Sequence, residues 1–248
     1  MSEGTSESAN GGPSRNVRLY GTEQPPAEPR VLRAGALSAE LDAGNLRHVR
    51  IAGVEAIRAV SFIVRDRDWG TYEPEISNLE VDEREGRFEI GYDAVAHEGE
   101  RRFEYRARIV GTPTELAFEA TGESPTGFET NRTGFVVLHP IAGVAGAPVT
   151  IERVDGGVEE GAFPEPIDPL QPMMELRALT HEPVPGVRVA CRMEGDTYEM
   201  EDQRNWTDAS YKTYVRPLAQ PWPYEIEAGE TLEQRVTLTV TGGSTGGG

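Results

Sequence analysis

The chain has 248 residues, of which 37% are hydrophobic and 27% are charged, a composition typical of a globular protein with a sizeable core. Its formal net charge at pH 7 is −18, so its surface repels DNA, RNA and anionic lipids, and the sequence argues against all three as partners. All-β proteins of this length commonly form one domain.

Both ends of the chain are rich in Ser, Gly and Thr. We therefore expect a disordered tail over 1–16, one domain over 17–240 and a Gly-rich tail over 241–248. No basic and apolar leader opens the sequence, and no apolar run approaches the ~20 residues of a membrane helix, so a cytoplasmic location is expected. Cys191 lies in an apolar alternating run, which predicts a buried, inert thiol.

Between the tails, apolar residues recur at every second position, which is the period of a β-strand. Three consecutive segments of this kind are separated by short turns and predict an antiparallel meander over 86–96, 102–110 and 115–123. A single helical turn is expected near 53–60. Further predicted strands cover 31–42, 45–51, 54–65, 76–82, 132–138, 148–154, 173–180, 187–199, 210–216 and 231–240. Together they predict an all-β fold, a large antiparallel two-sheet β-sandwich.

Three stretches interrupt the alternation with polar and aromatic residues. The first, VRDRDWGTYEPEISN, contains Asp68 and Trp69, and it also fits a surface ladder of ion pairs. The second, FETNRTGFVVLHP, contains Asn131, Arg132 and His139. The guanidinium of Arg132 offers a rigid donor fork for a carboxylate or for hydroxyls. His139 ends an apolar strand, so it is either a half-buried histidine or a base.

The third such stretch is MEDQRNWTDASYKTYVRP, which contains Lys212, the only lysine of the chain. Carboxylates and amides grip the hydroxyls of sugars, and aromatic rings stack on their C–H faces. The stretch supplies both types, which favours a sugar site over a structural polar network. The candidate residues here are Glu201, Asp202, Asn205, Trp206, Asp208, Tyr211 and Lys212.

Signatures of several enzyme classes are missing from the sequence. It contains no G-x-S-x-G elbow, no zinc-spaced Cys/His cluster and no P-loop. No cofactor is therefore expected. A divalent metal stays open, because Glu201, Asp202 and Asp208 could hold Ca²⁺, although their spacing does not match an EF-hand loop.

Three segments together resemble the N-terminal part of the D-apionate lactonases, bacterial enzymes of apiose breakdown. They are LYGTEQPPAEPRVLRAGALSAELDAGNLRHVRIAGVEAIRAVSFIVRDRDWGTY, NRTGFVVLHP and EDQRNWTDASYKTYVRPLAQPWPYEIEAGE. The resemblance implies hydrolysis of D-apionolactone to the open acid, and the strand pattern is similar to the galactose-mutarotase type of β-sandwich. Members of the family are longer and continue into a barrel domain. A non-catalytic sugar-binding or assembly module, with the barrel encoded separately, is therefore the alternative.

Hydrolysis of a lactone needs a base for water and a donor for the carbonyl oxygen. We expect Glu201 or Asp202 as the base, with His139 as a rival, and Lys212 and Arg132 as partners of the oxyanion or of a substrate carboxylate. Trp206 and Tyr211 would form the wall that faces the sugar. The predicted binding set is completed by Asn131, Asn205, Asp208, Asp68 and Trp69. A weaker alternative is a mutarotase-like epimerase, for which His139 or His181 would pair with Glu175 or Glu201.

Overall fold

The computed structural model describes residues 13–24 and 28–242. Helix α1 (Arg15–Tyr20) begins after Ser14, whose hydroxyl accepts a hydrogen bond from the N–H of Val17 at 3.1 Å. The last two residues of the predicted tail over 1–16 are therefore helical, and residues 1–12 lie outside the described part. Of the predicted tail over 241–248, residues 241 and 242 belong to the last strand, which ends at Gly242, and the rest lies outside the described part.

Sixteen strands form one antiparallel sheet whose main path runs β1-β2-β3-β4-β10-β16-β15-β13-β14-β18-β8-β7-β6-β5. The strands of this path are β1 (Arg30–Ala34), β2 (Leu37–Asp42), β3 (Asn45–Ile51), β4 (Val54–Val64), β5 (Glu75–Arg84), β6 (Arg87–Glu98), β7 (Arg101–Gly111), β8 (Glu115–Glu123), β10 (Thr133–Pro140), β13 (Met173–Val184), β14 (Val187–Glu194), β15 (Tyr198–Asp202), β16 (Ser210–Val215) and β18 (Thr231–Gly242). The hairpin of β11 (Pro148–Arg153) and β12 (Val158–Ala162) joins the sheet through β13. A separate small sheet pairs β9 (Phe128–Thr130) with β17 (Tyr224–Ile226).

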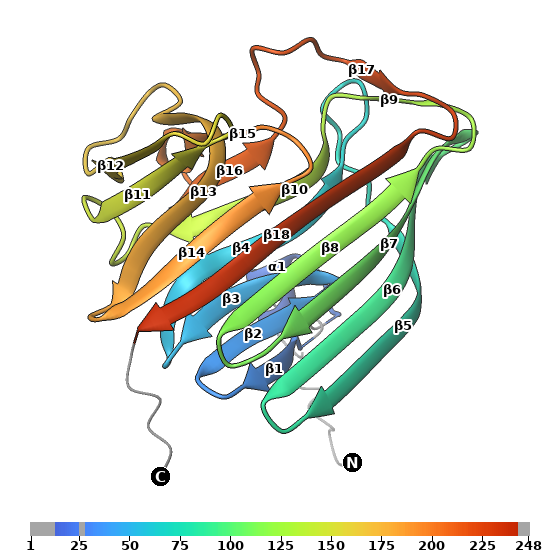
Figure 1. Cartoon of the computed structure of the whole chain (residues 1–248). Helices are drawn as coiled ribbons and strands as arrows, with labels where there is room; N and C mark the ends of the chain where they lie inside the picture. Colours follow the sequence, from blue (N-terminus) through green and yellow to red (C-terminus); the bar gives the residue numbers. More distant parts are fainter. Residues whose placement is uncertain (1–12, 25–27, 243–248) are drawn as a thin grey trace, which may run out of the picture.

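The long sheet curls over so that its two halves face each other as layers (Figure 1). Strands β5 to β8, β18 and β14 form one layer, and β1 to β4, β10, β16 and β15 form the other. The predicted large antiparallel β-sandwich is thus confirmed, although hydrogen bonds run continuously from one layer to the other.

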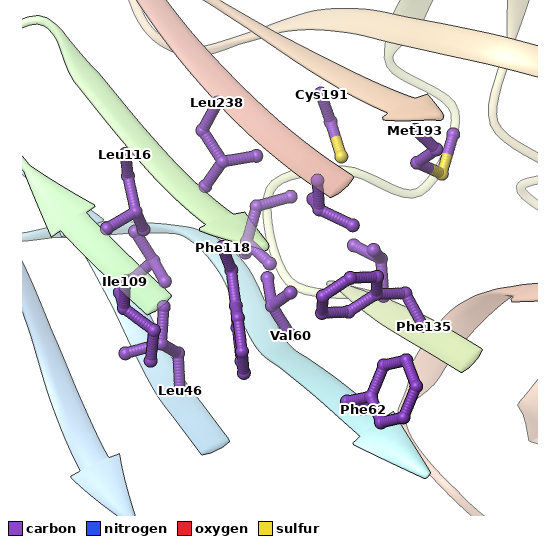
Figure 2. Packing of buried hydrophobic residues seen from close by; sticks show 14 of the residues in the cluster. Leu46, Val60, Phe62, Ile109, Leu116, Phe118, Phe135, Cys191, Met193 and Leu238 are labelled. Atoms are coloured by element: carbon purple, nitrogen blue, oxygen red, sulfur yellow. The ribbon is translucent and has the colours of Figure 1, made fainter. Parts of the chain in front are cut away.

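The core lies between the two layers (Figure 2). Phe135 of β10 contacts Phe118 of β8 edge to face, with ring centroids 4.9 Å apart, and so joins the layers. Cys191 is fully buried among these residues, and burial raises the pKa of its thiol to about 12. The prediction of a buried thiol is confirmed.

The structure differs from the predicted strands at four places. The segment 31–42 is a hairpin that turns at Gly35, whose φ of +60° suits a residue without a side chain. The segment 187–199 divides into β14 and β15, which both pair with β13 but differ in their second neighbours, β18 and β16. The expected helical turn over 53–60 is wrong, because these residues enter β4. Short strands β9, β12 and β17 lack a long apolar alternation and were not predicted.

Candidate functional site

Residues of strand β16 alternate between the two faces of its layer. Tyr211, Thr213 and Val215 belong to one set of positions, and Lys212 and Tyr214 belong to the other. In the adjacent strand β15, Glu201 lies opposite Lys212 and Glu199 lies opposite Tyr214. We call the site around Lys212 and Tyr214 the cationic face. Its residues are Arg65, Trp69, Arg132, Glu199, Glu201, Lys212 and Tyr214.

Arg132 is the most unusual side chain of the cationic face. It is only 3% exposed, and its Nε has no hydrogen-bond partner in the described part of the chain. Its Cζ lies 3.9 Å from the ring centroid of Tyr214 and 5.2 Å from that of Trp69. Burial lowers the pKa of Arg132 and the charge of Arg65 adds to this effect, whereas Tyr214, Glu201 and Glu199 oppose it. The guanidinium is therefore held by aromatic rings instead of a contacting carboxylate.

Two loops place Arg132 beside Trp69. The carboxylate of Asp66 accepts hydrogen bonds from the N–H groups of Asp68 and Gly70, each at 2.7 Å, which folds the loop into a tight turn. The backbone carbonyl of Arg132 accepts a hydrogen bond from the N–H of Arg65 at 2.8 Å. The first and second polar stretches of the sequence thus meet here.

The second loop is fixed to the first by Asn131. Its side-chain amide donates to the carbonyl oxygen of Arg67 at 2.7 Å, while its buried Oδ1 has no partner among the described residues. Asp68 and Arg67 are exposed on the same turn, and Arg67 pairs with Glu129 at 2.9 Å. Asn131 therefore positions the turn that carries Trp69.

Lys212 contributes a second cation from the third polar stretch. Its Nζ lies 3.9 Å from Oε2 of Glu201, and its side chain is 17% exposed. Burial, followed by the positive charge of Arg132, lowers the pKa of Lys212 to about 8, against the opposing effects of Glu201 and Asp208. Its ammonium is thus poised to lose a proton near neutral pH.

Glu201 and Trp206 form the more open side of the cationic face. Trp206 follows β15 in the 3₁₀ helix η1 (Gln203–Trp206), and the residue is 68% exposed. The indole N–H of Trp206 donates to Oε1 of Glu201 at 2.7 Å. This bond leaves the second carboxylate oxygen of Glu201 directed to the side of Lys212.

Glu199 is the buried acceptor that holds Tyr214 of the cationic face. It is 1% exposed and accepts hydrogen bonds from the hydroxyl of Tyr214 at 2.7 Å and from the N–H of Leu218 at 2.8 Å. Burial, together with the bond to Glu199, raises the pKa of Tyr214, so its hydroxyl stays a donor. The ring that stacks on Arg132 is therefore fixed in place. Nearby, Trp222 packs edge to face on Trp69, with ring centroids 5.3 Å apart.

Three predicted site residues support another part of the molecule. Asp202 is fully buried, and its carboxylate accepts hydrogen bonds from the guanidinium of Arg204 at 2.6 Å and from the N–H of Asp168 at 3.1 Å. Although its burial acts in the opposite direction, these bonds lower the pKa of Asp202. Asn205 donates to the carbonyl oxygen of Asp168, and Tyr211 packs on Phe163 with centroids 5.3 Å apart. They tie the segment 163–168 to β15 and η1.

His139 of β10 is a buried residue and does not belong to the cationic face. It is fully buried, and its ring centroid is 5.4 Å from that of His181 and 5.4 Å from that of Phe163. Burial lowers the pKa of His139 well below the usual value and that of His181 to about 4. Glu175 is exposed on β13. The structure brings neither histidine together with Glu201, so the epimerase alternative is not favoured.

The sequence and fold of the whole chain identify its relatives. Residues 17–243 match the family model of the D-apionate lactonase N-terminal domain. A D-apionate lactonase from Brucella anthropi is 52% identical over 229 residues, which are 90% of this chain and 37% of that relative. The chain belongs to the D-apionate lactonase family. It spans just over a third of the length of this curated relative.

Solved structures show the same fold in more distant proteins. A galactose mutarotase-like protein from Lactobacillus casei has a TM-score of 0.57 at 9% identity, covering 86% of this chain and 100% of that one. Another from Clostridium acetobutylicum has a TM-score of 0.54 at 9% identity, covering 86% and 95%. The lactonase N-terminal domain therefore has a galactose mutarotase-like fold.

Four residues near the cationic face were not among the predicted site residues: Arg65, Glu199, Tyr214 and Trp222. Strand parity was the signal that could have found Tyr214, because side chains two apart in a strand share a face with Lys212. Glu199 follows once β15 is placed beside β16. Arg65 and Trp222 depend on how loops fold back, which no local pattern shows.

Within residues 13–24 and 28–242, no group of three or more His, Cys, Asp or Glu side chains is arranged to hold a metal ion. Within the same ranges, no helix has the length and apolar character needed to cross a membrane.

Proposed function

We propose that the cationic face binds a sugar lactone and that this chain takes part in its hydrolysis to the open acid, with the lactone of D-apionate as the substrate. The observation that carries this proposal is the buried guanidinium of Arg132, whose Nε has no hydrogen-bond partner among the described residues, beside Lys212. The name and identity of the Brucella anthropi relative support it. We place the reaction in apiose breakdown in the cytoplasm.

Hydrolysis requires that water attack the lactone carbonyl, whose oxygen then gains negative charge. The N–H groups of Arg132 and Lys212 stabilise this charge in a partly buried site, where electrostatic interactions are stronger than in water. Glu201 accepts the proton of the attacking water. The tetrahedral intermediate then collapses, the bond to the ring oxygen breaks, and that oxygen takes the proton back as a hydroxyl.

Aromatic side chains on the cationic face supply the contacts for the sugar ring. Tyr214 and Trp69 are held in place by Glu199 and by the loop of Asp66, so their rings are ordered before a ligand arrives. Trp206 offers a largely exposed indole beside Glu201. Stacking on these rings orients the lactone so that its carbonyl points to Arg132.

The second candidate is a sugar-acid-binding part of a longer lactonase that leaves the chemistry to another domain. The chain covers only 37% of the length of its curated relative. A separately encoded barrel domain is the partner we propose in this case. Arg132 and Lys212 would then hold the substrate while the other domain supplies the base.

A panel of purified aldonolactones distinguishes the two candidates. Acid release is followed with a pH indicator, with and without EDTA, for the wild-type chain, Glu201→Gln and Arg132→Gln. Turnover that both substitutions reduce supports hydrolysis by this chain. Lactone binding without turnover, lost in Arg132→Gln, supports the binding role. Turnover that neither substitution changes would contradict both candidates.

A further inference from the structure

Arg132 differs from Arg192 and Arg235, two arginines of the other layer, in what surrounds its charge. Arg192 pairs with Glu152 at 2.9 Å, and Arg235 pairs with Glu119 at 3.0 Å, both at partly exposed sites. Arg132 is 97% removed from solvent, since only 3% of it is exposed, and its Nε has no partner in the described ranges. A buried charge without a contacting counter-ion lowers stability, so a fold that keeps one has another use for it.

The groups around Arg132 concentrate positive charge in an otherwise acidic protein. Arg65 donates to the carbonyl oxygen of Trp69 at 2.7 Å, and its buried Nε also lacks a partner among described residues. Lys212 meets Glu201 only at 3.9 Å, the outer limit of an ion pair. Glu199 is engaged by Tyr214 and Leu218. Within the described part of the chain, three cations thus face two carboxylates, and neither carboxylate lies within ion-pair distance of Arg132.

We propose that the cationic face is a binding site for the carboxylate of an open-chain polyhydroxy acid, with Arg132 as the anchor. This inference rests on the proposed function, because such an acid is the product of lactone hydrolysis. A carboxylate forms charge-assisted hydrogen bonds with a guanidinium, whereas the lactone carries no formal charge and offers a guanidinium only neutral acceptors. The site consequently holds the product more tightly than the lactone, and the product inhibits the reaction.

The same geometry rejects neutral sugars as preferred ligands. An aldose or a polyol can stack on Tyr214 and Trp69, but it leaves the charge of Arg132 buried and unpaired. The site thus selects for the acid group rather than for the hydroxyl pattern. The mutarotase-like fold is retained here with an anion as the ligand.

Isothermal titration calorimetry of this chain tests the inference with four- and five-carbon aldonates, polyols of the same length and acetate. We expect the aldonates to bind, the polyols to bind at least about tenfold more weakly, and acetate to compete at high concentration. Arg132→Gln should weaken aldonate binding about 10- to 100-fold. The matched control is Arg108→Gln on the opposite layer, where the guanidinium pairs with Glu89 at 2.7 Å, and it should bind like the wild type.

Three outcomes would overturn the inference: equal binding of aldonate and polyol, no aldonate binding at millimolar concentration, or full binding by Arg132→Gln. Thermal melting shows whether each variant folds. If Arg132→Gln does not fold, Arg132→Lys keeps a cation without the fork and should bind about tenfold more weakly. Aldonate binding without lactone turnover would contradict only hydrolysis by this chain, and turnover without aldonate binding would contradict only this inference.

Discussion

Two polar surfaces of the molecule use the same residue types in opposite ways. On strands β6 to β8, arginines and carboxylates alternate as exposed pairs, such as Arg106 with Asp93 at 2.9 Å and Arg108 with Glu89 at 2.7 Å. On the cationic face, Arg132 stacks on Tyr214 and Lys212 only approaches Glu201. The comparison shows that pairing and burial, rather than the number of charges, distinguish a solvated surface from a candidate site.

The largest expected effect is that of Glu201→Gln on lactone hydrolysis. The substitution keeps the hydrogen bond from Trp206 but removes the proton acceptor, so kcat should fall about 10²- to 10⁴-fold. Glu89→Gln on the arginine ladder is the matched control and should keep the wild-type rate. Equal rates for all three proteins in the pH-indicator assay would remove Glu201 from the mechanism.

The buried pair of His139 and His181 should make the protein less stable in acid. His181 has a pKa of about 4 in the folded protein and about 6.5 in the unfolded chain, so the unfolded state binds more protons between these values. The free energy of unfolding is therefore greatest above pH 6.5 and falls by about 3 kcal/mol toward pH 4 on account of His181 alone. His139 adds to the loss.

Urea denaturation at several pH values measures this effect. His181→Phe should make the free energy of unfolding less dependent on pH, whereas the exposed His97, which pairs with Glu75, should have little influence when changed to Gln. An unchanged acid slope in His181→Phe would show that other groups control the transition.

Lys212→Met should separate function from stability. Because burial disfavours the ammonium, its removal should raise the free energy of unfolding by about 1 to 3 kcal/mol while aldonate binding weakens roughly tenfold. Lys212→Arg keeps the charge, but its larger planar fork does not replace a compact ammonium, so most function should be lost. Full function in Lys212→Arg, with normal melting, would remove Lys212 from the site.

A smaller effect is expected when aldonate binding is measured at different pH values. Above its pKa of about 8 Lys212 loses its charge, so binding should weaken several-fold between pH 7 and pH 9. Lys212→Met should abolish this dependence. The charged and titratable groups that face Lys212 are Arg65, Arg132, Glu201, Asp208 and Tyr214. Binding that weakens equally in Lys212→Met would assign the effect to one of these groups.

The smallest effect belongs to the arginine ladder. Arg108→Gln breaks exposed contacts with Glu89 and Glu119, so the free energy of unfolding should change by about 0.5 kcal/mol or less. Lactone hydrolysis and aldonate binding should not change. A strong loss of either activity, with a normal melting curve, would show that the functional surface lies on β6 to β8 and not on the cationic face.

The sequence predicted the fold well where alternation is long and the turns are short. Strands β6, β7 and β8 bury alternate residues, and each begins within one or two residues of its expected start. It failed where one apolar run serves two strands, because periodicity does not show that the chain turns at Gly195 or that β15 then pairs with β16 where β14 had paired with β18. The side chains of β12 are nearly all exposed, so the apolar alternation that marks a half-buried strand is missing there.

The candidate site was predicted in part for a similar reason. Residue types pointed to the third polar stretch, and the structure places Lys212 and Glu201 on one face with Arg132 and Trp69. Grouping Tyr211 with Lys212 ignored strand parity, since neighbouring residues of β16 point to opposite faces. Whether Asp202 is free or paired depends on Arg204 and on the distant segment at Asp168, which only the folded chain shows.

A crystal structure of the chain with an aldonate bound tests the central claim most directly. We predict that the ligand carboxylate lies within hydrogen-bonding distance of the Arg132 guanidinium, with its carbon chain against Tyr214 and Trp69 and a hydroxyl near Glu201. A ligand bound instead over the arginine ladder of β6 to β8, with the cationic face empty at saturating aldonate, would contradict the assignment of the site to Arg132 and its neighbours.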